Sequence, residues 1–231
     1  MIPTLVRDAP SDTAPAVSEL LPGEGFAVLD ITGHWAWGYC LSDRRVGYVE
    51  AIELTDPLPV TYVVVEANAP IQPNRDPLSP PLSSLPMGSR LTGKVHGAMV
   101  MIEGGYVPLS YLHAVGEVEA DAATVAQRMI GAHWLAGGRT CRGIDCSGLV
   151  QLALQLCGVD CPRDVDMQRS LGEPIPARSG LKRGDIVFCG NVVGLMVDDQ
   201  LVVHVSETLG RVTVEPLHCI GALLERRRVS I

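Results

Sequence analysis

The chain has 231 residues, of which 47% are hydrophobic and 19% charged, a composition that suits a globular protein with a sizeable core. Its net charge is −8, and basic residues cluster only at 226–228, which argues against nucleic acid as a partner because nucleic acid requires a basic surface. No apolar run reaches the length of about 18 residues that a membrane-spanning helix needs, so the sequence predicts no membrane span.

The sequence predicts a cytoplasmic protein. Its first residues, MIPTLVRDAP, place Arg7 and Asp8 ahead of any apolar core long enough for a secretion signal. The seven cysteines are an odd number, which is typical of reduced thiols. Their spacings lack the C-x-x-C pairs of a structural zinc site, and the sequence predicts no metal and no other cofactor.

The first half of the chain predicts two small β-barrels. Short apolar runs are broken by Pro, Gly, Asp and Asn, as expected for short strands between frequent turns; the clearest runs are 26–31, 34–40, 46–54, 62–67 and 98–102. A weak repeat pairs the sequence LPG at 21–23 with LPMG at 85–88, and GYV at 47–49 with GYV at 105–107. We therefore expect one barrel over residues 1–57 and a second over residues 58–115.

The remaining residues, 116–231, predict an α+β domain. A helical spacing of apolar residues covers 117–130. A second helix, between Asp145 as N-cap and Gly158 after its C-terminus, is apolar almost all round and is therefore expected to be buried. Strands are predicted at 185–189, 192–197, 200–205 and 211–217, so this helix is expected to pack on an antiparallel sheet.

Cys146 begins the buried helix, within the segment GIDCSGLVQLAL. Unpaired N–H groups at a helix N-terminus stabilise a thiolate, which predicts a lowered pKa and a nucleophile suited to attack an amide. The alternative is that Cys146 is a buried core residue, since free cysteine is among the residue types most often buried. The position by itself leaves both interpretations open.

Three segments carry a resemblance to a known family. GGRTCRGIDCSGLVQLAL, CPRDVDMQ at 161–168 and LKRGDIVF at 181–188 resemble the NlpC cell-wall peptidases, which are papain-like cysteine peptidases, and the two barrels are similar to bacterial SH3 domains. The resemblance implies cleavage of murein peptides between γ-D-glutamate and a diamino acid, with a free N-terminal L-alanine on the peptide. It also implies that Cys146 is the nucleophile and that Asp145 and Ser147 hold the amino terminus of the substrate.

The resemblance fails at the general base. Family members carry a histidine in the strand after GDxVF, and Val192 stands at that position here, while His204 matches the polar residue that orients the base. Trp134 stands where the family usually has a tyrosine that lines the pocket. The length of the turn near Asp198 leaves open whether Val192 or Val193 lies opposite His204.

Three interpretations of the function follow. The first is a degenerate cell-wall peptidase, a pseudoenzyme that still binds murein peptides. The second is an active cysteine peptidase that uses His204, His133 or a water molecule as the base. The third is a protein-interaction scaffold without a peptide ligand. Val192 favours the first over the second, and the intact Asp145-Cys146-Ser147 segment favours the first over the third.

Overall fold

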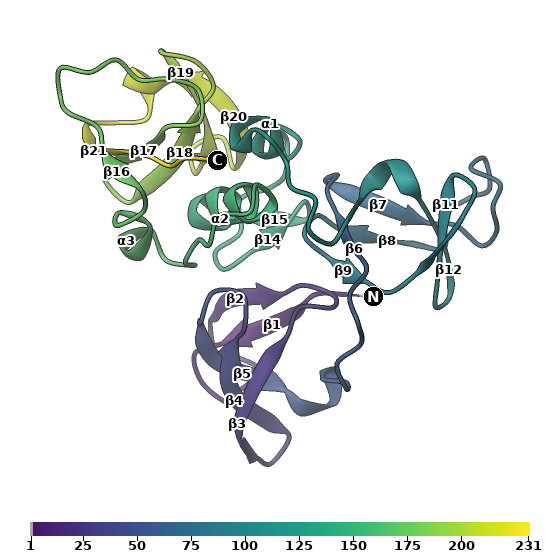
Figure 1. Ribbon diagram of the computed structural model, residues 1–231. Helices are drawn as coiled ribbons and strands as arrows, with labels where there is room; N and C mark the ends of the chain where they lie inside the picture. The colour runs from purple at the N-terminus through teal and green to yellow at the C-terminus, as the bar shows by residue number, and fades with distance from the viewer. Residues whose placement is uncertain (1) are drawn as a thin grey trace. The chain divides into compact units, whose positions relative to one another are not determined.

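The computed structural model describes residues 2–231, which divide into two compact units, 2–117 and 118–231. The first unit contains only strands and 3₁₀ turns, and the second contains helices packed on a sheet (Figure 1). None of the helices formed by these residues is long and apolar enough to cross a membrane. The boundary predicted near residue 57, inside the first unit, stays a prediction.

The first unit begins with a five-stranded antiparallel sheet. Its order is β2 (Ala16–Leu20), β1 (Thr4–Arg7), β5 (Val46–Glu50), β4 (Trp35–Cys40) and β3 (Phe26–Thr32). A 3₁₀ turn follows β5 at Ala51–Glu53, where the sequence predicts a longer strand. The buried side chains of Val6, Leu20, Ala36, Cys40 and Val49 form one cluster.

The rest of the first unit forms small sheets around a second buried cluster, which includes Val64, Leu85, Val100 and Val107. Strands β10 (Lys94–His96), β11 (Met99–Ile102) and β12 (Gly105–Pro108) make one sheet; β13 (Leu112–Ala114), β6 (Tyr62–Val64) and β9 (Arg90–Leu91) make another; β7 (Asn68–Ile71) and β8 (Ser83–Pro86) form a hairpin. A 3₁₀ turn, Leu109–Tyr111, precedes β13. Two separate clusters of apolar side chains therefore form in this unit, as two small β modules require.

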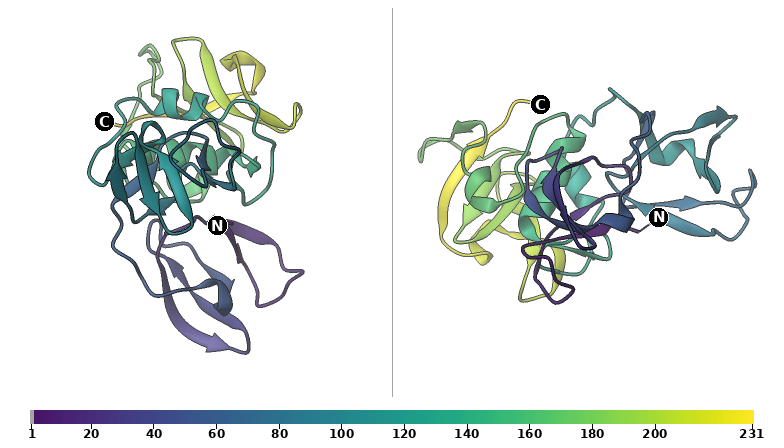
Figure 2. Two further views of the ribbon diagram at one scale, coloured as in Figure 1. Left: turned by 90° about the vertical axis from the view of Figure 1, so that its right-hand side faces the viewer. Right: turned by 90° about the horizontal axis from the view of Figure 1, so that it is seen from below.

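The second unit is built on a six-stranded antiparallel sheet. Its order is β16 (Glu173–Pro174), β21 (Leu223–Arg228), β17 (Ile186–Cys189), β18 (Val192–Met196), β19 (Leu201–Ser206) and β20 (Arg211–Pro216). A two-stranded ribbon of β14 (Arg139–Thr140) and β15 (Gly143–Ile144) precedes the buried helix, and a 3₁₀ turn, Leu217–Cys219, follows β20. The right-hand view of Figure 2 shows the strands as a layer beside the helices.

Helix α2 (Cys146–Leu156) lies against β18 and β19. The Asp145 side chain caps it by accepting the Gly148 N–H at 2.8 Å, and Gly158, with φ +79°, follows its C-terminus, as the sequence predicts. Eight of its eleven residues are buried, which confirms the expected burial. A short helix, α3 (Val165–Gln168), lies between α2 and the sheet strands in the sequence.

Two expectations for this unit are wrong. The helix predicted over 117–130 is limited to α1 (Ala122–Gln127), because Asp121 caps it by accepting the Ala123 N–H and the residues before Asp121 are not helical. The register of the β18–β19 hairpin also differs: Gly194 lies opposite His204, and neither Val192 nor Val193 does. The Asp198 carboxylate accepts the N–H groups of Gln200 and Leu201, and the Val197 N–H donates to the Leu201 carbonyl at 2.7 Å, so this turn sets the register.

Candidate functional site

Cys146 lies where the N-terminus of α2 meets the start of β18. Its Sγ donates to the carbonyl oxygen of Asn191 at 3.6 Å, and the N–H groups of Val193 and Ser147 point at the same sulfur. The β18–β19 ladder ends at the pair Gly194 and His204, which leaves the Val193 N–H available to the thiol. Within residues 2–231, no imidazole nitrogen forms a hydrogen bond with this sulfur.

The pKa of the Cys146 thiol is raised above its ordinary value. Burial is the largest cause, since desolvation penalises the thiolate, and the negative charge of Asp145 adds to it. The N–H groups of Val193 and Ser147 and the positive charge of Arg163 act in the opposite direction and do not outweigh burial. The lowered pKa predicted from the helix N-terminus is therefore wrong, and the thiol is protonated at neutral pH.

The Asp145 carboxylate is fully engaged within the protein. Arg163, of which only 3% of the side chain is exposed, forms a bidentate pair with it at 2.9 and 2.6 Å. The N–H groups of Gly148 and Gly137 donate to its two oxygens, each at 2.8 Å, and the Ser147 hydroxyl approaches it at 3.1 Å. These five donors exceed the roughly four lone-pair positions of a carboxylate, so an added ammonium group would have to displace one of them.

Ser147 belongs to the same buried network. Its hydroxyl accepts a hydrogen bond from Arg163 Nη1 at 2.7 Å, and its carbonyl accepts one from Gln168 Nε2 at 3.0 Å. Gln168 is fully buried and also donates to the Pro162 carbonyl at 2.8 Å. Neither Arg163 nor Gln168 has a role predicted from the sequence. The sequence feature that could have indicated them is two long polar side chains, five residues apart, between the mainly apolar helix and the next strand.

His204 is held by a neighbouring strand. The side chain is 4% exposed, and its Nε2 lies 3.0 Å from Glu215 Oε2 on β20. Because a carboxylate only accepts, Nε2 carries the proton, and within the described residues Nδ1 has no hydrogen-bond partner. His204 lies opposite Gly194, so Val192 is two residues further along the same face of β18. Val192 is half-buried and has no group that exchanges protons.

The backbone places Trp134 close to the start of α2. It forms a bridge with Ile144, which directly precedes Asp145, and its N–H donates to the Gly210 carbonyl at 2.9 Å. The indole is 44% exposed, so it offers an aromatic surface. His133, the weaker candidate for a replacement base, is exposed, and its backbone bridges Arg211.

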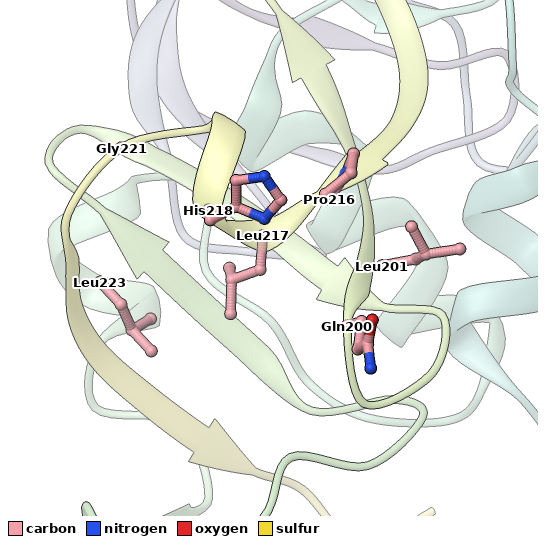
Figure 3. A pocket seen from close by; sticks show the side chains of 7 residues that line it. All are labelled: Gln200, Leu201, Pro216, Leu217, His218, Gly221 and Leu223. Atoms are coloured by element: carbon pink, nitrogen blue, oxygen red, sulfur yellow. The ribbon is translucent and has the colours of Figure 1, made fainter.

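An apolar hollow of about 530 Å³ lies elsewhere in this unit. It is lined by Gln200, Leu201, Pro216, Leu217, His218, Gly221 and Leu223 (Figure 3). Leu201 begins β19 and Pro216 ends β20, so the hollow lies at the opposite end of these strands from Ser206 and Arg211. Cys146 is not among its lining residues, and the hollow is not part of the candidate site. Among residues 2–231, no group of three or more His, Cys, Asp or Glu side chains could hold a metal ion.

A half-buried cysteine at the start of a buried helix, on an antiparallel sheet, is the arrangement of a papain-like α+β domain. Residues 131–222 match the model of the NlpC/P60 family, and residues 6–54 match the model described as the bacterial dipeptidyl-peptidase Sh3 domain. Residues 131–222 therefore form an NlpC/P60 domain, with a bacterial SH3 domain before it at residues 6–54.

Individual relatives agree with this assignment. The chain is 38% identical over 98 residues to a probable endopeptidase NlpC homolog of Haemophilus influenzae, covering 41% of this chain and 52% of the relative. It is 35% identical over 86 residues to the murein DD-endopeptidase MepS/murein LD-carboxypeptidase of Escherichia coli K12, covering 35% of this chain and 45% of the relative. The chain thus spans about half the length of these two curated relatives.

A solved structure extends the similarity of fold to almost the whole chain. An NlpC/P60 family protein from Bacillus cereus ATCC 10987 superposes with a TM-score of 0.83, covering 98% of this chain and 96% of that one. The two sequences are 16% identical, so the comparison establishes the fold alone.

Proposed function

We propose that the C-terminal unit binds murein peptides and hydrolyses them slowly or not at all. One observation carries the proposal: the Cys146 thiol, with its raised pKa, donates to a backbone carbonyl, and no imidazole bonds to it among residues 2–231. The thiolate, and not the thiol, is the nucleophile of a cysteine peptidase.

The neighbouring groups supply no replacement base. A general base must come within roughly 2.6–3.2 Å of the proton it accepts, or act through one water, and the position that the resemblance assigns to the base holds Val192. His204 keeps its protonated nitrogen on Glu215. Loss of a general base costs about 10²- to 10⁴-fold in rate. We therefore expect turnover to be lower than that of an ordinary cysteine peptidase by at least this factor.

The ligand class follows from the family. The relatives are named as endopeptidases and, for the Escherichia coli protein, as a murein endopeptidase and carboxypeptidase. We propose peptides of the form L-Ala-γ-D-Glu-diamino acid with a free amino terminus. Because five donors already surround Asp145, binding of the ammonium group there requires the exchange of at least one of them. The exposed ring of Trp134 is a candidate surface for the rest of the peptide.

Calorimetric titration of the full chain with the free tripeptide and with its N-acetylated form tests binding. Mass spectrometry of the same mixtures tests hydrolysis, with Cys146→Ala as the control. We expect heat with the free peptide, less with the acetylated one, and no cleavage that depends on Cys146. Cleavage that disappears in Cys146→Ala would identify a working peptidase. If neither peptide produced heat at concentrations into the millimolar range, the proposed binding would be rejected and the scaffold interpretation would remain.

A cytoplasmic location is part of the same proposal. The acidic composition and the odd number of cysteines support it. Fractionation of the source cells, with detection by an antibody against the chain, is the measurement. Recovery of the protein outside the cytoplasm would reject this part and leave the proposal about binding unaffected.

A further inference from the structure

Arg169 directly follows α3 and contacts the hairpin that forms one side of the Cys146 site. Its Nη2 donates to the carbonyl of Gly190 at 2.6 Å, and its Nη1 donates to Glu225 at 3.0 Å. The guanidinium group lies over the ring of Phe188, 5.0 Å from its centroid. The Asp166 carboxylate lies 3.6 Å from Arg169 Nε, so a carbonyl, two carboxylates and an aromatic ring hold the side chain.

The Gly190 carbonyl belongs to the two-residue turn between β17 and β18. Cys189 pairs with Val192 on either side of the turn, and Gly190 adopts φ +62°, as such tight turns require. The next carbonyl, that of Asn191, is the acceptor for Cys146 Sγ at 3.6 Å. At that length a small rotation of the turn would break the S–H bond, so the position of the turn decides whether the bond exists.

We propose that Arg169 is a positioning residue for Cys146: by holding the Gly190 carbonyl, it fixes the turn so that the Asn191 carbonyl accepts the thiol proton. Arg169 thereby favours the protonated, unreactive form of the thiol. This role concerns the state of the sulfur in the free protein, so it can be tested whether or not the domain binds or cleaves peptides.

The charged and polar groups that act on the thiol allow the positioning role to be separated from a direct charge effect. These groups are the charges of Asp145 and Arg163 and the N–H groups of Val193 and Ser147, together with the Asn191 carbonyl. If Arg169 acted directly through its positive charge, its removal would raise the pKa of Cys146. If it acts through the turn, its removal frees the S–H from its acceptor and lowers the pKa. The two effects have opposite signs.

Arg169→Met is the test, because methionine keeps an apolar stem over Phe188 and removes every donor. Glu225→Gln is the matched control, since it removes the ion pair of Arg169 with Glu225 and leaves the contact with Asp166 and the bond to Gly190. The rate of alkylation by iodoacetamide is measured against pH on the native full chain. Fragment ions distinguish Cys146 from Cys157 and Cys161, which share its tryptic peptide.

We expect a lower titration midpoint for Cys146 in Arg169→Met and alkylation at pH 7 that is about threefold faster, the size of effect that one weak hydrogen bond allows. Glu225→Gln should match the parent. An unchanged or raised midpoint in Arg169→Met, or an equal shift in Glu225→Gln, would overturn the proposal. Circular dichroism checks folding, and Arg169→Leu, which also lacks every donor, replaces the methionine variant, with the same expectation and the same refutation, if that variant does not fold.

Discussion

Replacement of Asp145 by asparagine should destabilise the C-terminal unit, even though asparagine caps helices about as well as aspartate. The side-chain oxygen of the asparagine can keep the bond from the Gly148 N–H. Its amide nitrogen would then face two donors, the Gly137 N–H and Arg163 Nη2, which now lie 2.8 and 2.6 Å from the carboxylate. Arg163 would stay buried and lose the carboxylate that now accepts two of its hydrogen bonds.

Breaking a buried ion pair by removal of one partner costs about 3–5 kcal/mol. Because Asp145 is 19% exposed and Arg163 keeps the Ser147 hydroxyl and the Gly138 carbonyl as acceptors, we expect the lower end, about 3 kcal/mol. Asp121→Asn is the matched control in the same unit. Asp121 also caps a helix and pairs with an arginine, Arg183, but the two side chains are 32% and 40% exposed, so its loss should cost under about 1 kcal/mol.

Native-state hydrogen exchange of the α2 amides, read by mass spectrometry, measures the difference locally. A loss of about 3 kcal/mol accelerates exchange by about a hundredfold or more, since each 1.4 kcal/mol is tenfold. Asp121→Asn should change it by less than about fivefold. If Asp145→Asn exchanged no faster than Asp121→Asn, the Arg163 pair would not stabilise the start of α2, and the reasoning would fail. The same result would make Asp145→Asn usable as a pure test of ligand charge.

Three further predictions use the same unit. Val192→His should restore measurable, Cys146-dependent cleavage of the tripeptide, because the new imidazole would share a face with His204, whose Nδ1 is unpaired; a variant as inert as the parent in a peptide-cleavage assay would refute this. Burial raises the pKa of Asp121, but its bonds to Thr124 and Arg183 outweigh burial and lower the pKa overall. The stability that the Asp121 carboxylate contributes is therefore present above the unfolded pKa of about 3.9 and is lost as the pH falls through the folded value. The stability difference between the parent and Asp121→Asn, measured by urea unfolding, should shrink below about pH 4. Gly158→Ala should cost about 1 kcal/mol in the same assay, since φ is +79° and an added Cβ would lie 3.0 Å from Val118 Cγ1, and an unchanged midpoint would contradict it.

The fold class and the secondary structure around the site could be predicted because they depend on residues close together in the sequence. Helix α2 has its cap, its apolar residues and its terminal glycine in one continuous segment, so its bounds follow from the sequence. Strands β17 to β20 of the C-terminal sheet are apolar runs between turns, and each was predicted to within about two residues.

Features that depend on tertiary contacts could not be predicted in the same way. Strand β21 was not predicted, because Arg226, Arg227 and Arg228 interrupt any apolar run, yet Arg228 pairs with the buried Asp185 at 2.7 Å. The register of the β18–β19 hairpin depends on two hydrogen bonds to the Asp198 side chain. A prediction from the length of the turn alone does not include these bonds. Burial, a property of the whole unit, decides the pKa of Cys146 against the local effect of the helix N-terminus.

The residues around Cys146 differ in whether they also have a structural role. Asp145, Ser147, Arg163 and Gln168 form a hydrogen-bonded network at the start of α2, which gives each of them a structural role whatever the domain does. His204 is retained by its bond to Glu215 within the sheet. A base at residue 192 would have no such structural role. Val192 is half-buried on β18 and keeps the strand pairing with Cys189, as suits a β-branched residue. On the proposed function, a valine there removes proton transfer and leaves the surrounding structure intact. Val192→His is therefore the sharpest test of whether this single residue accounts for the proposed lack of activity.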